Sequence, residues 1–424
     1  MRHDGTRSEP SEPAPAEAKA AERAAVLVAG DGIVALAAAI ALRDALGEKA
    51  RIVMAAAPPA RGAALDGRAF AIAPSSRRLL SKLGVWHELE EGAEPILDIV
   101  ITDSRLEDLV RPSFLSFGGE AGPGEALAHM VEAQALQEAL GRKAQMARIE
   151  RLFDPVRGIR ASGDAIRVTM TGGHAIAAEL LVAADGARSF CRELAGIGWI
   201  GWKYAQLGLT TTILHERLHG GRAHEHFLPG GPFAILPLKG RRSSIVWAEG
   251  IEEAKRLLAL RDAELVSEIT RRFGHELGHL RLEGPIASYP LSCGAARSFI
   301  GPRLALVGDA AHSVHPVAGQ GLNLGLRDVA ALAEAAGDAA RLGLDPGSAH
   351  ALSSYQRARR FDTIAMGALT DGLVKLFSND LPALRALRDL GLGIVDRLPL
   401  MKGFLEREAA GQVASSAPIP RGDS

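Results

Sequence analysis

Residues 308–325, GDAAHSVHPVAGQGLNLG, combine an acid, two histidines, a proline and several glycines in one short stretch. The stretch follows the strand-like RLALV, and a long amphipathic helix is expected to begin near Gly321. Asp309 can accept a hydrogen bond from a hydroxyl group, and few side chains between Pro316 and Gly321 leave the backbone N–H groups approachable. The positive end of the helix would face the same ligand. The pattern predicts a site where a ligand lies against the main chain.

A second chemical signal lies near the start of the chain. The apolar run at 24–29 leads into GDGIVA, which fits G-x-G-x-x-A between a strand and a helix. Gly30 allows the tight turn, Gly32 lets a pyrophosphate approach the backbone, and Ala35 keeps the helix close to the sheet. The motif predicts dinucleotide binding, and a bare strand–turn–helix connection is the alternative.

The second strand of this unit lacks the acid that would hold an adenosine ribose. It reads RIVMAAAPP, with Ala55 where the acid is expected. Either another group holds the ribose, or the nucleotide binds weakly.

Three further patterns are interpreted as structural. GIGWIG at 196–201 matches G-x-G-x-x-G, but Trp199 would crowd a phosphate and a strand-like segment follows. HELGH at 275–279 matches a zinc motif, yet it extends a charged amphipathic pattern and is interpreted as a solvated helix end. His219, His224 and His226 are expected at the surface and at strand edges. No metal site is predicted.

Composition narrows the class of protein. The chain has 424 residues, 47% of them hydrophobic, and a net charge of −1, which argues against a nucleic-acid partner. The two cysteines, Cys191 and Cys293, and the lack of a secretory signal favour a reducing, cytoplasmic setting. No run of about 18 apolar residues is free of charge, so a spanning helix is not expected. Contact with a membrane surface stays open.

The elements that must position these motifs alternate in kind. Buried strand patterns recur at 24–29, at 51–55 and before Asp185 and Asp309. Other strand-like segments lie before residue 120, among them LVRPSFLSF, and between 206 and 249, which predicts a sheet inserted in pieces. After Gly321 the pattern is mostly helical to about Ala410.

At this point the sequence resembles a known family. GDGIVA, ADGARS at 184–189 and GDAAHSVHPVAGQGLNLGLRD are similar to three fingerprints of the FAD-dependent aromatic hydroxylases related to p-hydroxybenzoate hydroxylase. The finer resemblance is to the ubiquinone-biosynthesis hydroxylases. It rests on GRAFAIAPSSRRLLSKLGVW, HEHFLPGGPFAILPL, SYPLS, the late motif and the segment from TDGLVKLFSND to VDRLP, and it spans about residues 24–412.

The resemblance implies an α/β fold: a Rossmann-like FAD-binding domain, an inserted, mainly antiparallel β-sheet substrate domain and a helical C-terminus. The implied order is a disordered lead-in (1–23), FAD-binding domain (24–95), substrate-domain strands (96–118), FAD-binding domain (119–200), substrate domain (201–292), FAD-binding domain (293–345), C-terminal helices (346–412) and a tail (413–424).

The implied activity is hydroxylation of a polyprenylated phenol through a flavin C4a-hydroperoxide, with O2 and an external electron donor as co-substrates. Other enzymes of ubiquinone synthesis are possible partners. No general base is assigned. The cofactor-binding residues implied by the motifs are Gly30, Gly32, Ala35, Arg68, Asp185, Gly186, Gly308, Asp309, Pro316, Gly319, Gln320, Gly321, Leu322 and Asn323.

Other interpretations stay open at this level. One is a flavoenzyme acting on another substrate, and another is a non-catalytic scaffold or lipid carrier. The second is favoured only by Ala55 and by Ala133, where relatives usually carry a polar cofactor contact. The apolar residues of the inserted sheet could line a substrate pocket or simply pack in a core; they are Phe227, Phe233, Ile235, Leu236 and Trp247. The terminal helices could rest on a membrane or a partner, or pack as ordinary helices.

Overall fold

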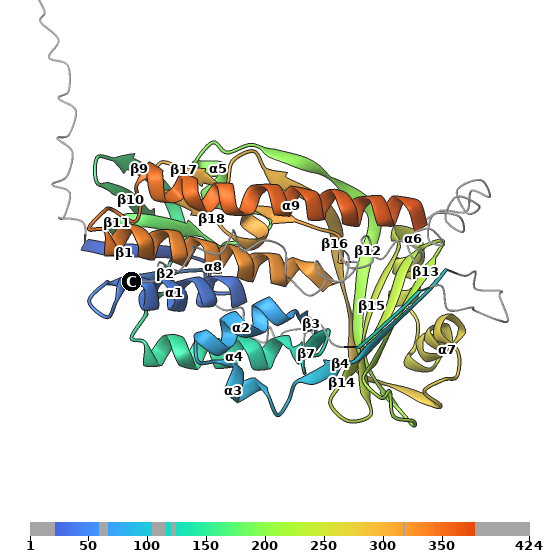
Figure 1. The fold of residues 1–424 in the computed structure, drawn as a ribbon. Helices are drawn as coiled ribbons and strands as arrows, with labels where there is room; N and C mark the ends of the chain where they lie inside the picture. The colour runs from blue at the N-terminus through green and yellow to red at the C-terminus, as the bar shows by residue number, and fades with distance from the viewer. Residues whose placement is uncertain (1–21, 59–66, 104–114, 120–123, 317–318, 378–424) are drawn as a thin grey trace, which may run out of the picture.

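The computed structural model describes residues 22–58, 67–103, 115–119, 124–316 and 319–377. Figure 1 shows a layered part of helices and sheet on one side. On the other side lies a large sheet backed by α7 (Asp262–Phe273). The α/β fold with an inserted antiparallel sheet and a helix at the end of the described chain is confirmed.

The first sheet has the strand order β17-β18-β11-β1-β2-β8. Its core strands pair in parallel; they are β1 (Glu22–Ala29), β2 (Ile52–Ala55), β8 (Glu150–Leu152), β11 (Ala175–Ala183) and β18 (Leu304–Leu306). The central strands are buried on both faces, which explains their continuous apolar sequences. Three antiparallel strands extend the sheet: β9 (Val156–Ser162), β10 (Ala165–Met170) and β17 (Ile300–Gly301).

Four long helices accompany this sheet: α1 (Ile33–Leu46), α4 (Ala133–Met146), α8 (Gln320–Arg341) and α9 (Ala349–Phe377). α1 packs against α4 and α8, and α8 packs against α9 (Figure 1). Glycines let α8 approach α1: a Cβ atom at Gly325 would lie 2.9 Å from Val34, and one at Gly337 would lie 3.3 Å from Ala45. The late glycines therefore also hold two distant parts of the chain together.

A small antiparallel sheet joins the two parts of the molecule. It consists of β3 (Ala69–Ile72), β7 (Ala128–Glu132) and β4 (Glu94–Ile96). Three short helices complete this region and the edge of the first sheet: α2 (Pro74–Lys82), α3 (Trp86–Leu89) and α5 (Phe190–Leu194).

The large sheet has the order β19-β16-β12-β15-β14-β13-β5-β6. Its strands are β5 (Asp98–Asp103), β6 (Leu115–Gly118), β12 (Trp199–His215), β13 (Arg222–Leu228), β14 (Gly231–Leu238), β15 (Arg242–Gly250), β16 (Leu280–Ala296) and β19 (His312–Ser313). All its pairs are antiparallel except β5 with β13. The domain boundaries expected from the sequence stay predictions, although this sheet does combine strands from 98–118 and 199–296.

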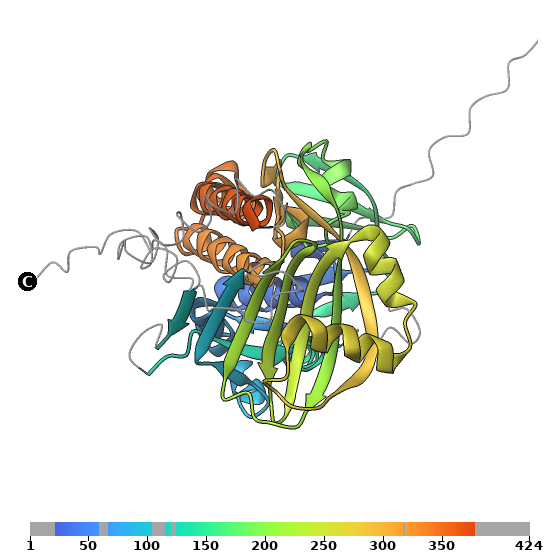
Figure 2. The ribbon, with the colours of Figure 1, turned by 90° about the vertical axis from the view of Figure 1, so that its right-hand side faces the viewer.

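The two faces of the large sheet differ. α6 (Ile251–Leu258) and α7 cover one face, here called the helix-covered face (Figure 2). Phe233, Ile235 and Trp247 pack there in a core with residues of both helices, so these three do not line the face toward the first sheet. Leu236 lies on the opposite, inner face, in a cluster with residues of β3, β4 and β7.

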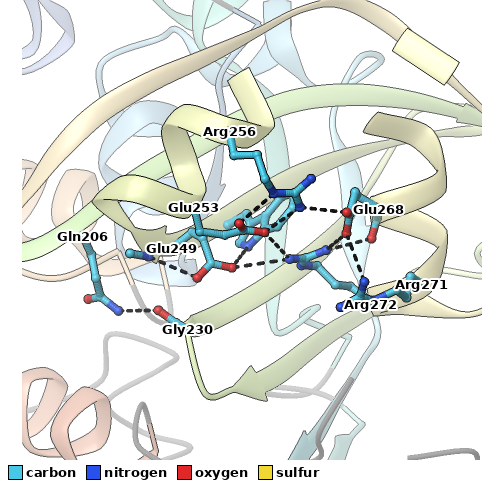
Figure 3. Close-up of polar contacts among 10 residues, drawn as sticks. Gln206, Gly230, Glu249, Glu253, Arg256, Glu268, Arg271 and Arg272 are labelled. Atoms are coloured by element: carbon cyan, nitrogen blue, oxygen red, sulfur yellow. Dashed lines mark hydrogen bonds and ion pairs between the residues drawn. The ribbon is translucent and has the colours of Figure 1, made fainter. Parts of the chain in front are cut away.

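A buried arginine fixes the two helices to the sheet. Arg272 of α7 is 2% exposed, and its guanidinium lies 4.2 Å from the centre of the Trp247 ring. It pairs with Glu268 at 2.5 Å, with Glu253 at 3.5 Å and with Glu249 at 3.6 Å (Figure 3). Burial raises the pKa of Glu249, although Arg272 favours its charged form. The cluster joins β15, α6 and α7.

Three sequence-based expectations about the helix-covered side are wrong or incomplete. HELGH is not a helix end but a turn, because α7 ends at Phe273 and Gly274 adopts a φ of 97°. His224 and His226 are not at the surface: they are 6% and 4% exposed, and both rings contact Phe273. Because side chains alternate along β13, both rings point toward α7. The local sequence does not show that a helix covers this face of the sheet.

Two other expectations reach beyond the described residues. LVRPSFLSF at 109–117 overlaps β6 only at its end, and residues 104–114 lie outside the described part. The C-terminal helical segment is described as α9 to Phe377, and the expected helices from 378 to 412 lie outside it.

Candidate active site

Gly30 is needed because the chain crosses the end of a neighbouring strand. Its φ is 120°, and an added Cβ atom would lie 2.4 Å from the carbonyl oxygen of Ala184, at the end of β11. Its own N–H donates to the carbonyl of Ala55 at 2.8 Å. Ala35 lies directly beneath, fully buried and 3.4 Å from the same Cβ position. The tight turn and close helix packing expected from G-x-G-x-x-A are both present.

Gly32 begins α1 with its backbone open. It is the N-cap residue, no side chain caps the helix, and a Cβ atom at Gly32 would meet no other atom within 4 Å. The first N–H groups of α1 are therefore available to a ligand, and the helix dipole favours a negative one. A diphosphate fits this position.

The edge beside Ala55 carries a charged pair that the sequence did not predict. Ala55 ends β2 and is 2% exposed. Asp31 lies 3.4 Å from the Arg151 guanidinium of β8, the strand next to β2. Both side chains are about one-third exposed. They are the polar groups that flank the position where a ribose-binding acid was expected.

The late motif turns directly beside α1. β18 leads into a short 3-10 helix, η1 (Gly308–Ala310), and Gly308 has a φ of 58°. A Cβ atom at Gly308 would lie 3.1 Å from Val34 of α1, so the first and last glycine motifs are in contact. Bringing them together required folding about 280 residues between them.

Asp309 sits in a crowded position that solvent still reaches. Its side chain is exposed, yet enough atoms surround it that burial raises the pKa of its carboxyl. His312 and Arg68 act in the opposite direction and favour the charged form. The structure thus brings Arg68, directly before β3, into the electrostatic surroundings of Asp309. A carboxyl reached from one side can accept a hydrogen bond from a sugar-alcohol hydroxyl.

The start of α8 repeats the open arrangement of α1. Gly319 is the N-cap, with a φ of 60° and an N–H that donates to Pro316 at 2.9 Å. No side chain caps α8, and a Cβ atom at Gly321 would meet no other atom within 4 Å. Gln320 is buried, and Leu322 packs against the core. Residues 317 and 318 of this loop lie outside the described part.

Asn323 anchors the loop to the small sheet. Its side-chain oxygen accepts from the N–H of Ala73 at 2.9 Å, and its amide donates to the carbonyl of Ala71 at 2.8 Å. A second, longer bond reaches the carbonyl of Gly319. The side chain is committed to positioning α8 against β3, so any contact with a cofactor would come from its backbone.

Asp328 is the central residue that sequence reasoning missed. It is fully buried in α8 and accepts from the N–H of Gly308 at 3.0 Å, from His312 at 2.5 Å and from Arg359 of α9 at 2.9 Å. Burial alone would raise the pKa of Asp328, but His312 and Arg359 outweigh it and hold the pKa below its usual value. The sequence shows only an acid in the helix that follows the motif, and nothing near this acid identifies the residues that it contacts.

The middle motif serves the same region. Asp185 accepts from the hydroxyl of Ser189 at 2.5 Å and from the N–H of Cys191 at 3.0 Å, and so holds Ser189, the N-cap residue of α5, in place. Gly186 has a φ of 83°, which lets the chain turn there. Arg192 is 7% exposed and donates to the carbonyls of Ala187 and Ala310. It ties this turn to η1.

A polar group also lies behind the last loop. His315, directly before Pro316, is fully buried, and burial lowers its pKa to about 4, so the ring is neutral at neutral pH. Its ring meets Tyr204 of β12 edge-on at 5.0 Å, and Tyr204 donates to Asp371 of α9 at 2.7 Å. Burial raises the pKa of Tyr204 as well. The large sheet, α9 and the loop therefore meet here.

Together these features fit FAD. Two uncapped helix starts with open glycines suit a diphosphate and an electron-rich ring edge, and Asp309 suits a ribityl hydroxyl. In the part of the chain that the structure describes, no group of three or more metal-ligating side chains gathers. None of the helices described there combines the length and apolar character that crossing a membrane requires.

Comparisons with known proteins agree with this geometry. Residues 23–361 match the family described as FAD binding domain. The chain is 42% identical to ubiquinone hydroxylase UbiL of Rhodospirillum rubrum, over 97% of this chain and 95% of that protein. It is 34% identical to 3-demethoxyubiquinol 3-hydroxylase of Escherichia coli, over 81% of this chain and 86% of that protein.

Among solved structures, p-nitrophenol 4-monooxygenase PnpA of Pseudomonas putida has a similar fold. The TM-score is 0.73 at 20% identity, with 93% of this chain and all of that chain covered. At this identity the likeness supports the fold, while the sequence matches show the family.

Proposed function

Because the chain belongs to the FAD-binding family of flavin-dependent monooxygenases, we propose that it hydroxylates the aromatic ring of a polyprenylated phenol in ubiquinone synthesis. The observation that carries the proposal is 42% identity to a ubiquinone hydroxylase along nearly the whole chain, with both helix starts and Asp309 in place. O2 and an external reductant are the co-substrates.

The residues of the site would hold FAD in three places. The start of α1 at Gly32 would bind the diphosphate, Asp309 would accept from the ribityl chain, and the start of α8 at Gly321 would face the ring. When bound and reduced, FAD supplies the activation of O2 that aromatic hydroxylation requires.

The protein's own contribution is electrostatic and geometric. The N–H groups at the start of α8 stabilise negative charge, and the effect grows where water is excluded. Asn323 and Asp328 hold α8 and the Gly308 turn in one arrangement through bonds to three other elements. His315 presents a neutral ring beside the loop at neutral pH, so it adds no positive charge.

A substrate with an isoprenoid tail resides in a membrane, so the proposal includes contact with a membrane surface. Phe361 and Ile364 of α9 are 80% and 48% exposed and lie about one helical turn apart, which supports such contact. A liposome flotation assay tests it, with Phe361→Ser expected to reduce the floated fraction. A wild-type protein that stays at the bottom of the gradient would contradict it.

Oxygen-isotope labelling tests the reaction. The FAD-loaded protein is given a 2-polyprenylphenol in detergent, a reductant and ¹⁸O2, and the product is analysed by mass spectrometry. One labelled oxygen atom is expected, as a new hydroxyl group attached to the ring. A protein that binds FAD yet hydroxylates only small soluble aromatics would refute the substrate, and one that hydroxylates nothing would favour a scaffold role.

A further inference from the structure

Glu225 is an acid of the large sheet that faces away from the helices covering it. It lies in β13 between His224 and His226, whose rings contact Phe273 of α7 at 5.1 and 5.8 Å between ring centres. Because side chains alternate along a strand, Glu225 must lie on the inner face. Ala223, two residues earlier, confirms this, since it packs in the inner-face cluster with residues of β4 and β7.

The residues that pair with Glu225 and continue its row across the inner face are small or apolar. Ile101 of β5 and Ala234 of β14 pair with it directly, and Val246 and Thr210 continue the same row across β15 and β12. None of these side chains titrates. Among the described residues, none donates a hydrogen bond or forms an ion pair with Glu225, so its carboxyl lacks the partner that an enclosed acid normally has.

Other atoms surround the carboxyl of Glu225, but part of the residue remains accessible to solvent. The residue is partly exposed, yet burial raises the pKa of Glu225 to about 8, and no charged group among the described residues contributes to the shift. Desolvation without compensation costs free energy. A ligand that donates a hydrogen bond to the carboxyl would remove that cost.

The inner face leads from Glu225 to the start of α8. Leu236 and Ala223 share the inner-face cluster with Ala71 of β3. Ala71 in turn lies 3.5 Å from the Cβ position of Gly319, the residue that begins α8. The inner-face cluster therefore connects the face that carries Glu225 with the residue that precedes α8.

An aromatic side chain lies on the same face. A Cβ atom at Gly208 of β12 would lie 2.6 Å from the ring of Tyr289, so that ring covers Gly208. Gly208 is next to Leu209, which packs on the helix-covered face, and so it lies on the inner face. Gly208 lies three strands from β13 and two residues from Thr210, which is level with Glu225, so roughly 16 Å separate Glu225 from the position that the ring covers.

We propose that the Glu225 carboxylate accepts the hydrogen bond of the substrate's phenolic hydroxyl and so fixes how the ring lies on the inner face. The inference rests on the proposed function, because it needs a phenol as ligand. The interaction specifies a hydroxyl: an ether at the same position cannot donate, and it would leave the carboxylate unpaired.

Equilibrium dialysis of the FAD-loaded protein against 2-prenylphenol and its methyl ether tests the inference without relying on turnover. The wild type should bind the phenol at least tenfold more tightly than the ether, and Glu225→Gln should lower only the affinity for the phenol, by about tenfold. Glu252→Gln, an exposed acid of α6, is the matched control and should change neither.

The pH dependence gives a second readout. The affinity of the wild type for the phenol should rise from pH 6.5 to 8.5 as the carboxylate forms, and the profile of Glu225→Gln should be flat. An equal loss for both ligands, or no loss for either, would overturn the inference while leaving the proposed function intact. If the wild type holds FAD but binds neither ligand, the proposed substrate class fails, and the inference with it.

Discussion

Replacing Asp328 by asparagine should weaken the link between the turn at Gly308 and α9 while preserving the shape of the side chain. The carboxylate accepts three hydrogen bonds, from Gly308, His312 and Arg359. Asparagine offers one oxygen, so its NH2 group must face at least one of the three donors. Asp328 is fully buried and Arg359 is 4% exposed, so water cannot replace the lost partner.

The expected cost follows from this geometry. Breaking a buried ion pair typically costs about 3–5 kcal/mol. Arg359 keeps a second partner, Asp362 at 3.2 Å, so the lower end, about 3 kcal/mol, applies. In a chain of 424 residues that corresponds to a fall in Tm of roughly 3–4 °C. FAD affinity should fall too, because the N–H of Gly308 loses the acceptor that orients its turn.

Thermal unfolding with and without saturating FAD, together with an FAD titration, measures both effects. Asp338→Asn is the matched control, since it makes the same change on the same helix where the side chain is 54% exposed and paired only with exposed Arg341. It should shift the Tm by less than about 1 °C. If Asp328→Asn behaved like this control, the three bonds would contribute nothing to stability, and the reasoning would be refuted.

Three other substitutions test the site and its support. Gly30→Ala should abolish most FAD binding and reduce the soluble yield, because its Cβ atom would lie 2.4 Å from a carbonyl oxygen. Gly141→Ala in α4 is the control and should be tolerated, because a Cβ atom there would meet no other atom within 4 Å. The flavin content per purified protein distinguishes the two variants. Asp309→Ala should weaken FAD by about tenfold with little change in the apoprotein Tm, and an unchanged Kd in a fluorescence titration would remove Asp309 from the site. Arg272→Met should cost about 3 kcal/mol at pH 8 and less at pH 5. The direction of this pH dependence follows from Glu249. Burial already raises the pKa of Glu249 in the folded protein, and removing Arg272 raises that pKa further. The variant is destabilised by the ionised form of Glu249, and this form disappears as the pH falls. Equal Tm losses at both pH values would contradict this account.

The sequence predicted the elements whose signal is local. The buried run before Gly30, the two glycine turns and the start of α8 follow from residue types within a few positions of one another. The turn at HELGH has a local signal too, since Gly274 marks the end of α7, although the amphipathic pattern of that helix continues into the motif.

Long-range pairings were not predictable in this way. Asp328, His312 and Arg359 lie on three elements, and nothing near any of them identifies the other two. The faces of the large sheet were equally undetermined, because alternation shows that Phe233 and Leu236 lie on opposite faces but not which face α7 covers. Asp31 and Arg151 were missed for the same reason: their contact depends on β8 lying beside β2.

The contact between Val34 and Gly308 also determines when the FAD site can form in a newly synthesised chain. The first half of the cofactor cradle leaves the ribosome roughly 280 residues before Asp309, which at typical rates of synthesis is about 14–56 s earlier. During that interval β1 and α1 lack β18, α8 and the buried carboxylate of Asp328. FAD capture must therefore be a late event in biogenesis, and a truncation that ends before α8 should accumulate as a flavin-free chain exposing the apolar side of α1.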